Sequence, residues 1–211
     1  MKRKISVVIC AYNEESRIEA CLSSAKWADE LVVIDNSSTD RTSEIAKKYT
    51  DKVYLQPNDP LKIDLQKNTG FEKATSDYIL SLDADETISE ELRKEIEELL
   101  KKNNLKSGYE IPRKNIIFGK WIQNSIWWPD YQLRLFKKGK GKFEKESVHE
   151  PIKINGEIGQ LNHPLIHENY QTISQYLYKM ERIYTEVEAS KILKSGKTAS
   201  NNRIFLPAGW L

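Results

Sequence analysis

Two aspartates one residue apart, Asp83 and Asp85, are the side chains whose type and spacing most directly suggest chemistry. They follow the apolar segment 78–82, so a buried strand would deliver both carboxylates onto the turn at its end. Two carboxylates at this spacing suit a hard divalent cation, Mn²⁺ or Mg²⁺, which relieves their mutual repulsion. The alternative is a pair of solvated acids that cap the next helix. We expect the metal site, with phosphate oxygens as its remaining ligands.

Two further polar clusters follow predicted strands: Asn13-Glu14 and Asp35-Asn36. A single acidic residue after a strand is usually a turn former or an N-cap. Ligands of parallel sheets, however, bind outside the carboxyl ends of the strands, so all three clusters are expected to converge at one edge. The glycines form neither G-x-G-x-x-G nor G-x-x-x-x-G-K, and phosphates are therefore expected to be held chiefly through the metal.

The elements that must position these residues alternate along the first half of the chain. Apolar runs predict strands at residues 5–10, 31–34, 53–55 and 78–82. Helical spacing predicts helices at 15–27, 39–49 (N-capped by Ser37 or Ser38), 62–74 and 89–103. This alternation predicts an α/β fold, a parallel sheet with helices on both faces.

The second half of the chain reads differently. Strands are predicted at 109–113 and 133–136, a hairpin around Asn155-Gly156 that joins 152–154 to 158–161, and a helix over 172–193. Neither a repeat nor a linker separates the parts, so one domain over residues 1–211 is expected. Its parts are 1–105, 106–170, a C-terminal helix over 171–195 and an irregular tail over 196–211.

Composition excludes several classes of protein. The chain has 211 residues with 33 Lys and Arg against 31 Asp and Glu, a net charge of +2, which argues against a nucleic-acid binder. No apolar run approaches the roughly 20 residues of a membrane-spanning helix. The basic residues 1–4 and apolar residues 5–12 imitate a secretory signal, but Asn13-Glu14-Glu15 follow in place of a cleavage site. A buried strand in a cytoplasmic protein, with Cys10 and Cys21 reduced, is the better interpretation.

Three segments of this sequence together resemble the successive signatures of glycosyltransferase family 2, whose members are inverting enzymes with the GT-A fold. They are Ser6-Val7-Val8-Ile9-Cys10-Ala11-Tyr12-Asn13-Glu14-Glu15, Val32-Val33-Ile34-Asp35-Asn36-Ser37-Ser38-Thr39-Asp40-Arg41-Thr42 and Leu82-Asp83-Ala84-Asp85-Glu86. Further along, Trp128-Pro129-Asp130-Tyr131-Gln132-Leu133-Arg134-Leu135-Phe136 and Val148-His149-Glu150 resemble the bacterial subgroup that includes lipopolysaccharide-core β-glucosyltransferases. The resemblance covers roughly residues 4 to 185. It implies a GT-A, Rossmann-like, mostly parallel sheet flanked by helices, with a smaller acceptor-side β region and a C-terminal helix.

The resemblance also implies roles for particular residues. Asp35 falls where a uracil-type base is recognised, and Asp83 and Asp85 match the metal-binding D-x-D motif, with Asp85 the direct ligand. The donor nucleotide sugar would be held by residues of the 1–105 half, namely Ala11, Tyr12, Asn13, Glu14, Asp35, Lys67, Asn68 and Asp83. Family members often continue past this length with an amphipathic membrane-associating segment, which residues 206–211 do not resemble.

An inverting transfer needs a base that removes the proton of the acceptor hydroxyl. The downstream acids are Asp130, Glu144, Glu146 and Glu150. Glu150 is preferred because His149-Glu150 follows a strand and turn where the wider family carries its acid pair, and Asp130 is the second choice. His149 either orients the base, contacts the metal or is a structural histidine.

The 106–170 half is expected to bind the acceptor. Trp121, Trp127, Trp128 and Tyr131 form either a platform for sugars or a hydrophobic plug. Basic residues follow them, and these suit either a phosphorylated or lipid-linked acceptor at a membrane surface or a solvated hairpin: Arg134, Lys137, Lys138, Lys140 and Lys142.

The resemblance therefore implies a metal-dependent hexosyltransferase of cell-envelope or lipopolysaccharide synthesis. It would move a sugar from a UDP-sugar to a glycan or lipid-linked acceptor, at the cytoplasmic face of the inner membrane. Two alternatives stand beside it. One is a non-catalytic module that binds sugar nucleotides. The other is a phosphatase, because residues 83–87 also read D-x-D-x-T, although Asp130 is the single aspartate after Asp85.

Overall fold

The computed structural model describes residues 3–60, 62–124, 127–144 and 151–185, with backbone alone at 182–184. The strands are β1 (Ile5–Ala11), β2 (Glu30–Asp35), β3 (Val53–Leu55), β4 (Tyr78–Asp83), β5 (Glu86–Ile88), β6 (Gly108–Ile117), β7 (Lys120–Trp121), β8 (Asp130–Lys137), β9 (Gly141–Lys142), β10 (Lys153–Ile154), β11 (Ile158–Gln160) and β12 (Leu165–Tyr170). The helices are α1 (Ile18–Ala25), α2 (Thr42–Ala46), α3 (Ile63–Lys73), α4 (Glu90–Leu99), α5 (Ile173–Lys179) and a π-helix over Met180–Thr185. None of the helices in these ranges is long and apolar enough to cross a membrane.

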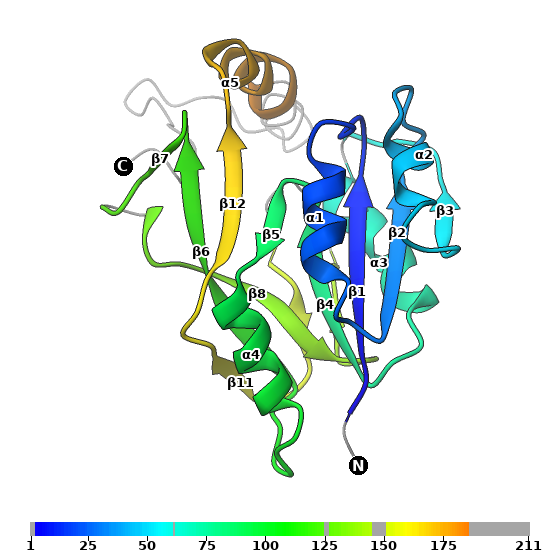
Figure 1. The fold of residues 1–211 in the computed structure, drawn as a ribbon, viewed down its shortest axis with the longest axis vertical. Coiled ribbons are helices and arrows are strands. Elements are labelled where there is room, and N and C mark those ends of the chain that lie inside the picture. The colour runs from blue at the N-terminus through cyan, green and yellow to red at the C-terminus, as the bar shows by residue number, and fades with distance from the viewer. Residues whose placement is uncertain (1–2, 61, 125–126, 145–150, 186–211) are drawn as a thin grey trace, which may run out of the picture.

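A ten-stranded mixed sheet forms the centre of the fold, with strand order β3-β2-β1-β4-β8-β6-β12-β5 (Figure 1). Strands β3, β2, β1 and β4 are parallel, as the sequence predicts. Strand β8 is antiparallel to both β4 and β6, and it joins the strands of the second half of the chain to the parallel part. Most of the smaller β region expected in the second half therefore continues the same sheet, with β7 and β11 both paired to β6, whereas β9 and β10 form a separate two-stranded sheet.

Alternation along β1 explains why helices cover both faces. Ile5, Val7 and Ile9 are buried in a core that also contains the apolar faces of α1, α2 and α4. Val8 points to the opposite face and belongs to a second core with Phe71 of α3. Because successive side chains of a strand point to opposite faces, an uninterrupted apolar run requires a helix on each side.

Gly70 brings α3 unusually close to the sheet. A Cβ atom at this position would lie 2.3 Å from Cγ1 of Val8 and 3.0 Å from Cγ1 of Ile34. Any larger residue would push the helix away from β1 and β2. This close approach fixes the height of Lys67, one turn earlier on α3, relative to the carboxyl ends of the strands.

Two local predictions are wrong. Asn155-Gly156 does not join a hairpin, because β10 pairs with β9 while β11 pairs in parallel with β6. Pairing with strands distant in sequence overrides the turn signal there. Neither Ser37 nor Ser38 caps α2, since Ser37 Oγ donates to Gln56 O and Ser38 Oγ accepts from Asn13 N.

Candidate functional site

The three polar clusters meet at the carboxyl ends of the parallel strands. The strand register pairs Ala11 of β1 with Asp35 of β2 and Cys10 of β1 with Asp83 of β4. Asn13 and Glu14 follow β1 directly, so they lie between the other two clusters. The expected convergence is therefore present.

Asp35 presents a carboxylate oxygen that lacks a partner among the residues that the structure describes. Its side chain is fully buried, and Oδ1 accepts a hydrogen bond of 2.9 Å from the Ser38 amide. Within the described ranges, Oδ2 has no hydrogen-bond partner. Because a buried acceptor without a partner is costly, this atom points to a donor group on a ligand.

Two of the side chains that follow β1 already form hydrogen bonds with other groups of the protein. Asn13 has a left-handed backbone (φ 55°), and its Oδ1 accepts from the Thr39 amide at 2.8 Å, which ties this turn to the segment after β2. Glu14 accepts two hydrogen bonds of 2.7 Å from Arg17. Tyr12 is exposed at the same edge. Tyr12 and Asn13 are thus exposed to solvent, whereas Glu14 is partly buried.

The Glu14 carboxyl is unusually basic. Burial raises its pKa to about 7, although the charge and hydrogen bonds of Arg17 act in the opposite direction. Arg17 also lies 3.6 Å from Asp85, so it connects Glu14 to the D-x-D motif.

Asp83 is enclosed by two cations. Lys67 Nζ lies 2.7 Å from Oδ1, and Arg134 Nη2 lies 2.6 Å from Oδ2. Burial acts to raise the pKa of Asp83, but the two cations outweigh it and hold the pKa well below its usual range. Both oxygens are thus committed to protein cations, so Asp83 is poorly placed to be a direct metal ligand.

The structure corrects the role expected for Arg134. The sequence places Arg134 in a basic strip for an anionic acceptor or a solvated hairpin, yet the side chain is buried and bonds to Asp83 and Glu86 from β8. The reason is topological, because β8 lies beside β4 in the sheet and turns this side chain toward the D-x-D motif. The lysines grouped with it are exposed: Lys137, Lys138, Lys140 and Lys142.

Asp85 has a different environment from Asp83. Arg17, His167 and Lys179 each approach its Oδ2 at 3.6 Å, which is beyond ordinary hydrogen-bond distance. Burial acts to raise its pKa, but His167 and Lys179 outweigh burial and favour the carboxylate. Asp85 therefore keeps an ionised oxygen that none of these neighbours binds tightly.

His167 is a site residue that the sequence analysis missed. It lies on β12, buried, with Nε2 toward Asp85 and Nδ1 2.7 Å from Oδ1 of Asn115 on β6. Asn115 in turn donates to Asp130 at 3.1 Å. The sequence analysis predicts no strand over 165–170, and local patterns do not indicate that this segment lies opposite the D-x-D motif.

Asp130, the second candidate base, belongs to the same network. Its Oδ2 accepts from Arg113 and Asn115, and its Oδ1 accepts from Gln132 at 2.7 Å. Burial acts to raise its pKa, but Arg113 and the amide donors outweigh burial and lower it. Asp130 is thus a carboxylate at neutral pH, connected to Asp85 through Asn115 and His167.

A divalent cation fits the Asp85–His167 pair. A carboxylate and an imidazole are both metal ligands, and the imidazole favours Mn²⁺ over Mg²⁺. In the described part of the chain, no group of three or more His, Cys, Asp and Glu side chains is arranged to hold a metal. Asp85 and His167 would therefore supply two of the ligands of such an ion.

Lys67 and Asn68, although adjacent in sequence, make different contacts. Lys67 lies on α3 between Asp64 and Asp83, and these charges outweigh burial and raise its pKa. The Asn68 amide instead exchanges two hydrogen bonds with the main chain of Phe143, at 2.9 and 3.0 Å. Lys67 faces the site, whereas Asn68 ties α3 to the segment after β9.

The aromatic residues lie around the start of β8. Trp121 and Trp128 pack edge to face with ring centroids 5.2 Å apart, and Tyr131 is exposed. Trp127 accepts a hydrogen bond from Asn115 through its carbonyl. His149 and Glu150 lie outside the described residues.

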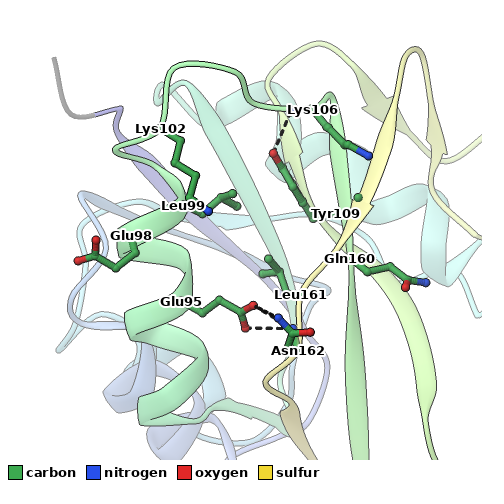
Figure 2. A pocket seen from close by; sticks show the side chains of 10 residues that line it. Glu95, Glu98, Leu99, Lys102, Lys106, Tyr109, Gln160, Leu161 and Asn162 are labelled. Atoms are coloured by element: carbon green, nitrogen blue, oxygen red, sulfur yellow. Dashed lines mark hydrogen bonds between the residues drawn. The ribbon is translucent and has the colours of Figure 1, made fainter.

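A pocket of about 370 Å³ lies elsewhere, between α4 and the start of β6 (Figure 2). Glu95 points across it and accepts hydrogen bonds from Asn162. None of the residues that line it belongs to the D-x-D site.

The chain matches the profile of "Glycosyl transferase family 2" over residues 6–156. It belongs to glycosyltransferase family 2. A glycosyltransferase of Rickettsia typhi is 31% identical over 220 residues, which cover 99% of this chain and 74% of the relative. The lipopolysaccharide core biosynthesis glycosyltransferase LpsC of Rhizobium meliloti is 26% identical over 93% of this chain and 74% of its own.

Two solved structures share the fold. Staphylococcus aureus TarS 1–349 in complex with UDP-GlcNAc superposes with a TM-score of 0.58 at 19% identity, over 80% of this chain and 59% of its own. Glucosyl-3-phosphoglycerate synthase from Mycobacterium tuberculosis, in complex with Mg²⁺ and UDP, has a TM-score of 0.53 at 18% identity. The superposition covers 94% of this chain and 81% of the synthase. The fold of this glycosyltransferase is therefore GT-A, as expected.

Proposed function

We propose that this glycosyltransferase moves a sugar from a UDP-sugar to a glycan or lipid-linked acceptor, with inversion at the anomeric carbon. One observation carries the proposal: a buried, unpartnered oxygen of Asp35 and the Asp85–His167 pair lie at the same edge of the sheet. A nucleoside diphosphate needs a site for its base and a site for its charged phosphates at once. The complexes of TarS with UDP-GlcNAc and of the synthase with Mg²⁺ and UDP support this assignment.

The donor is held by residues of the 1–105 half. Asp35 Oδ2 accepts from an N–H of the base, and Ala11 and Tyr12 border the nucleotide. Lys67, held beside Asp83, contributes positive charge toward the diphosphate. Asn13 and Glu14 shape this edge through their bonds to Thr39 and Arg17.

Asp85 and His167 would hold the divalent cation, Mn²⁺ in first place and Mg²⁺ as the alternative. When bound, the ion offsets the negative charge that develops on the departing diphosphate. Asp83 holds Lys67 and Arg134 in place and so keeps the surrounding charge balanced.

Of the two candidate bases, Asp130 is the one that lies within the described residues, where Arg113, Asn115 and Gln132 hold its carboxylate in place. As the acceptor oxygen attacks the anomeric carbon, its proton passes to the carboxylate and the bond from that carbon to the diphosphate oxygen breaks. Such a base typically contributes about 10²- to 10⁴-fold in rate. Glu150, with His149 beside it, is the alternative base.

The 106–170 half is the acceptor side. Trp127, Trp128 and Tyr131 flank Asp130 along the chain, and aromatic faces pack well against sugar rings. Similarity to LpsC supports an acceptor in cell-envelope or lipopolysaccharide synthesis. The exposed lysines after β8 suit an anionic, lipid-linked acceptor at the cytoplasmic face of the inner membrane.

A thermal-shift screen of UDP-, GDP-, CMP- and dTDP-sugars, with and without Mn²⁺, followed by turnover assays, tests the proposal. We expect stabilisation by UDP-sugars that depends on the metal, and release of UDP with an acceptor. Binding without any turnover across the donor panel would favour the alternative, a non-catalytic sugar-nucleotide-binding module.

A further inference from the structure

Asn115 uses every polar atom of its side chain, although it is fully buried on β6. Its Nδ2 donates to the Trp127 carbonyl and to Asp130 Oδ2, both at 3.1 Å. Its Oδ1 lies 2.7 Å from Nδ1 of His167. Arg113, on the same strand, bonds to Asp130 from another side.

These contacts fix the orientation of the amide. A carbonyl and a carboxylate can only accept, so the atom that faces them must be the NH₂ group. The Asn115 oxygen therefore faces His167, and an amide oxygen can only accept. Nδ1 of His167 must then carry a proton.

The proton on Nδ1 determines what His167 offers on its other side. A neutral imidazole protonated at Nδ1 has its lone pair on Nε2. That atom faces Asp85 Oδ2 at 3.6 Å, so the side of the ring turned away from Asn115 points at the carboxylate. A cation bound between Nε2 and Oδ2 would contact both atoms.

We propose that Asn115 is a positioning residue that sets two groups at once, the tautomer of His167 and the orientation of Asp130. This inference rests on the proposed function, since it gives His167 and Asp130 their roles. One buried amide thereby links the metal side of the site to the acceptor side. Hydrogen-bond partners of metal-ligating histidines typically change metal affinity by about 10- to 100-fold.

The tautomer is measured directly in the metal-free protein. Nitrogen-15 spectra of histidine-labelled protein distinguish a proton on Nδ1 from one on Nε2, and a His167→Gln variant identifies the signal among the three histidines. We expect His167 to carry its proton on Nδ1. A proton on Nε2 in the neutral imidazole would overturn the proposal without any variant of Asn115.

Two variants of Asn115 separate its two contacts. Asn115→Asp keeps an acceptor for His167 but places a second carboxylate against Asp130. Asn115→Leu has a similar shape and removes both contacts. We expect the Nδ1 tautomer to persist in Asn115→Asp and to be lost in Asn115→Leu.

The two variants should also differ in their effects on UDP affinity and on kcat. In Asn115→Asp, Mn²⁺-dependent affinity for UDP should stay within about twofold of the parent while kcat falls at least tenfold. In Asn115→Leu, that affinity should fall at least tenfold as well. Asn104 is exposed and lies near the other end of β6, so Asn104→Asp makes the same charge change away from the site. This control should match the parent in UDP affinity and in kcat.

If Asn115→Asp and Asn115→Leu match the parent in tautomer, affinity and kcat, Asn115 has no positioning role. If the parent itself binds UDP without regard to Mn²⁺, the proposed function fails instead. The histidine spectra of the metal-free protein separate these two outcomes, because they require neither metal nor donor.

Discussion

Nε2 of His167 lies 3.6 Å from Oδ2 of Asp85, although 81 residues separate the two in sequence. The contact brings β12, on the acceptor side of the sheet, against the turn after β4. Because Asp83 is already bonded to Lys67 and Arg134, Asp85 is the member of the D-x-D motif with an oxygen to offer. The structure therefore favours a metal held between the two halves of the chain.

Replacing Asp85 by Asn should abolish metal-dependent turnover and leave the fold intact. The amide keeps the shape of the side chain but removes the charge that a divalent cation needs. We expect kcat/KM to fall at least 10³-fold, about 4 kcal/mol of transition-state stabilisation, in a UDP-release assay. Asp51→Asn, an exposed change of the same kind, should leave the rate unchanged. Full activity of the Asp85 variant, or of the parent in excess EDTA, would contradict the assignment.

Replacing Asp35 by Asn should weaken binding of UDP. The change keeps the volume and places a donor where the structure has a free acceptor, Oδ2. We expect a loss of about 1 to 3 kcal/mol in binding free energy by calorimetry. Urea denaturation serves as the control, because Asp35 also accepts from the Ser38 amide. Unchanged affinity in a folded variant would assign Asp35 a purely structural role.

The base is decided by a pair of variants, Asp130→Asn and Glu150→Gln. Each removes basicity with little change of shape, so the true base should lose about 10²-fold or more in kcat while donor affinity is spared. Because Arg113 and Asn115 fix the orientation of Asp130, we expect the loss in Asp130→Asn. A dead Glu150→Gln beside an active Asp130→Asn would transfer the role to Glu150. Normal sugar transfer by both variants would show that neither Asp130 nor Glu150 is the base.

Local sequence patterns were enough to predict the parallel half of the sheet and the edge where its polar residues gather. The run from Val7 to Cys10 is apolar at successive positions, which requires helices on both faces of the sheet, and the strand ends then place Asp35 and Asp83 at one edge. What the sequence could not supply is which distant strands pair. That pairing puts Arg134 beside Asp83, brings His167 to Asp85 and replaces the predicted hairpin at Asn155-Gly156.

Glu30 should make the fold sensitive to acid. Burial acts to raise its pKa, but hydrogen bonds from Lys52, Ser6 and Thr75 outweigh burial and lower the pKa to about 2. A carboxyl with a lowered folded-state pKa contributes stability above its unfolded value near 4.5, and that contribution is lost as the pH falls toward 2.

Glu30→Gln should therefore reduce the free energy of unfolding at pH 7 by roughly 2 to 3 kcal/mol and flatten its dependence on pH between 5 and 2. Urea denaturation across this range measures both effects. The exposed Glu72→Gln on α3 is the matched control and should follow the parent. An identical pH dependence in Glu30→Gln and the parent would show that this buried carboxylate is not the acid-sensitive group.

The central claim is that Asp85 and His167 hold a divalent cation that binds the diphosphate of a UDP-sugar. Calorimetric titration of the parent protein with UDP, in Mn²⁺ and then in excess EDTA, tests it most directly. The account predicts at least tenfold tighter binding with Mn²⁺, and loss of that difference in His167→Gln. Equal affinity for UDP in Mn²⁺ and in EDTA would contradict it.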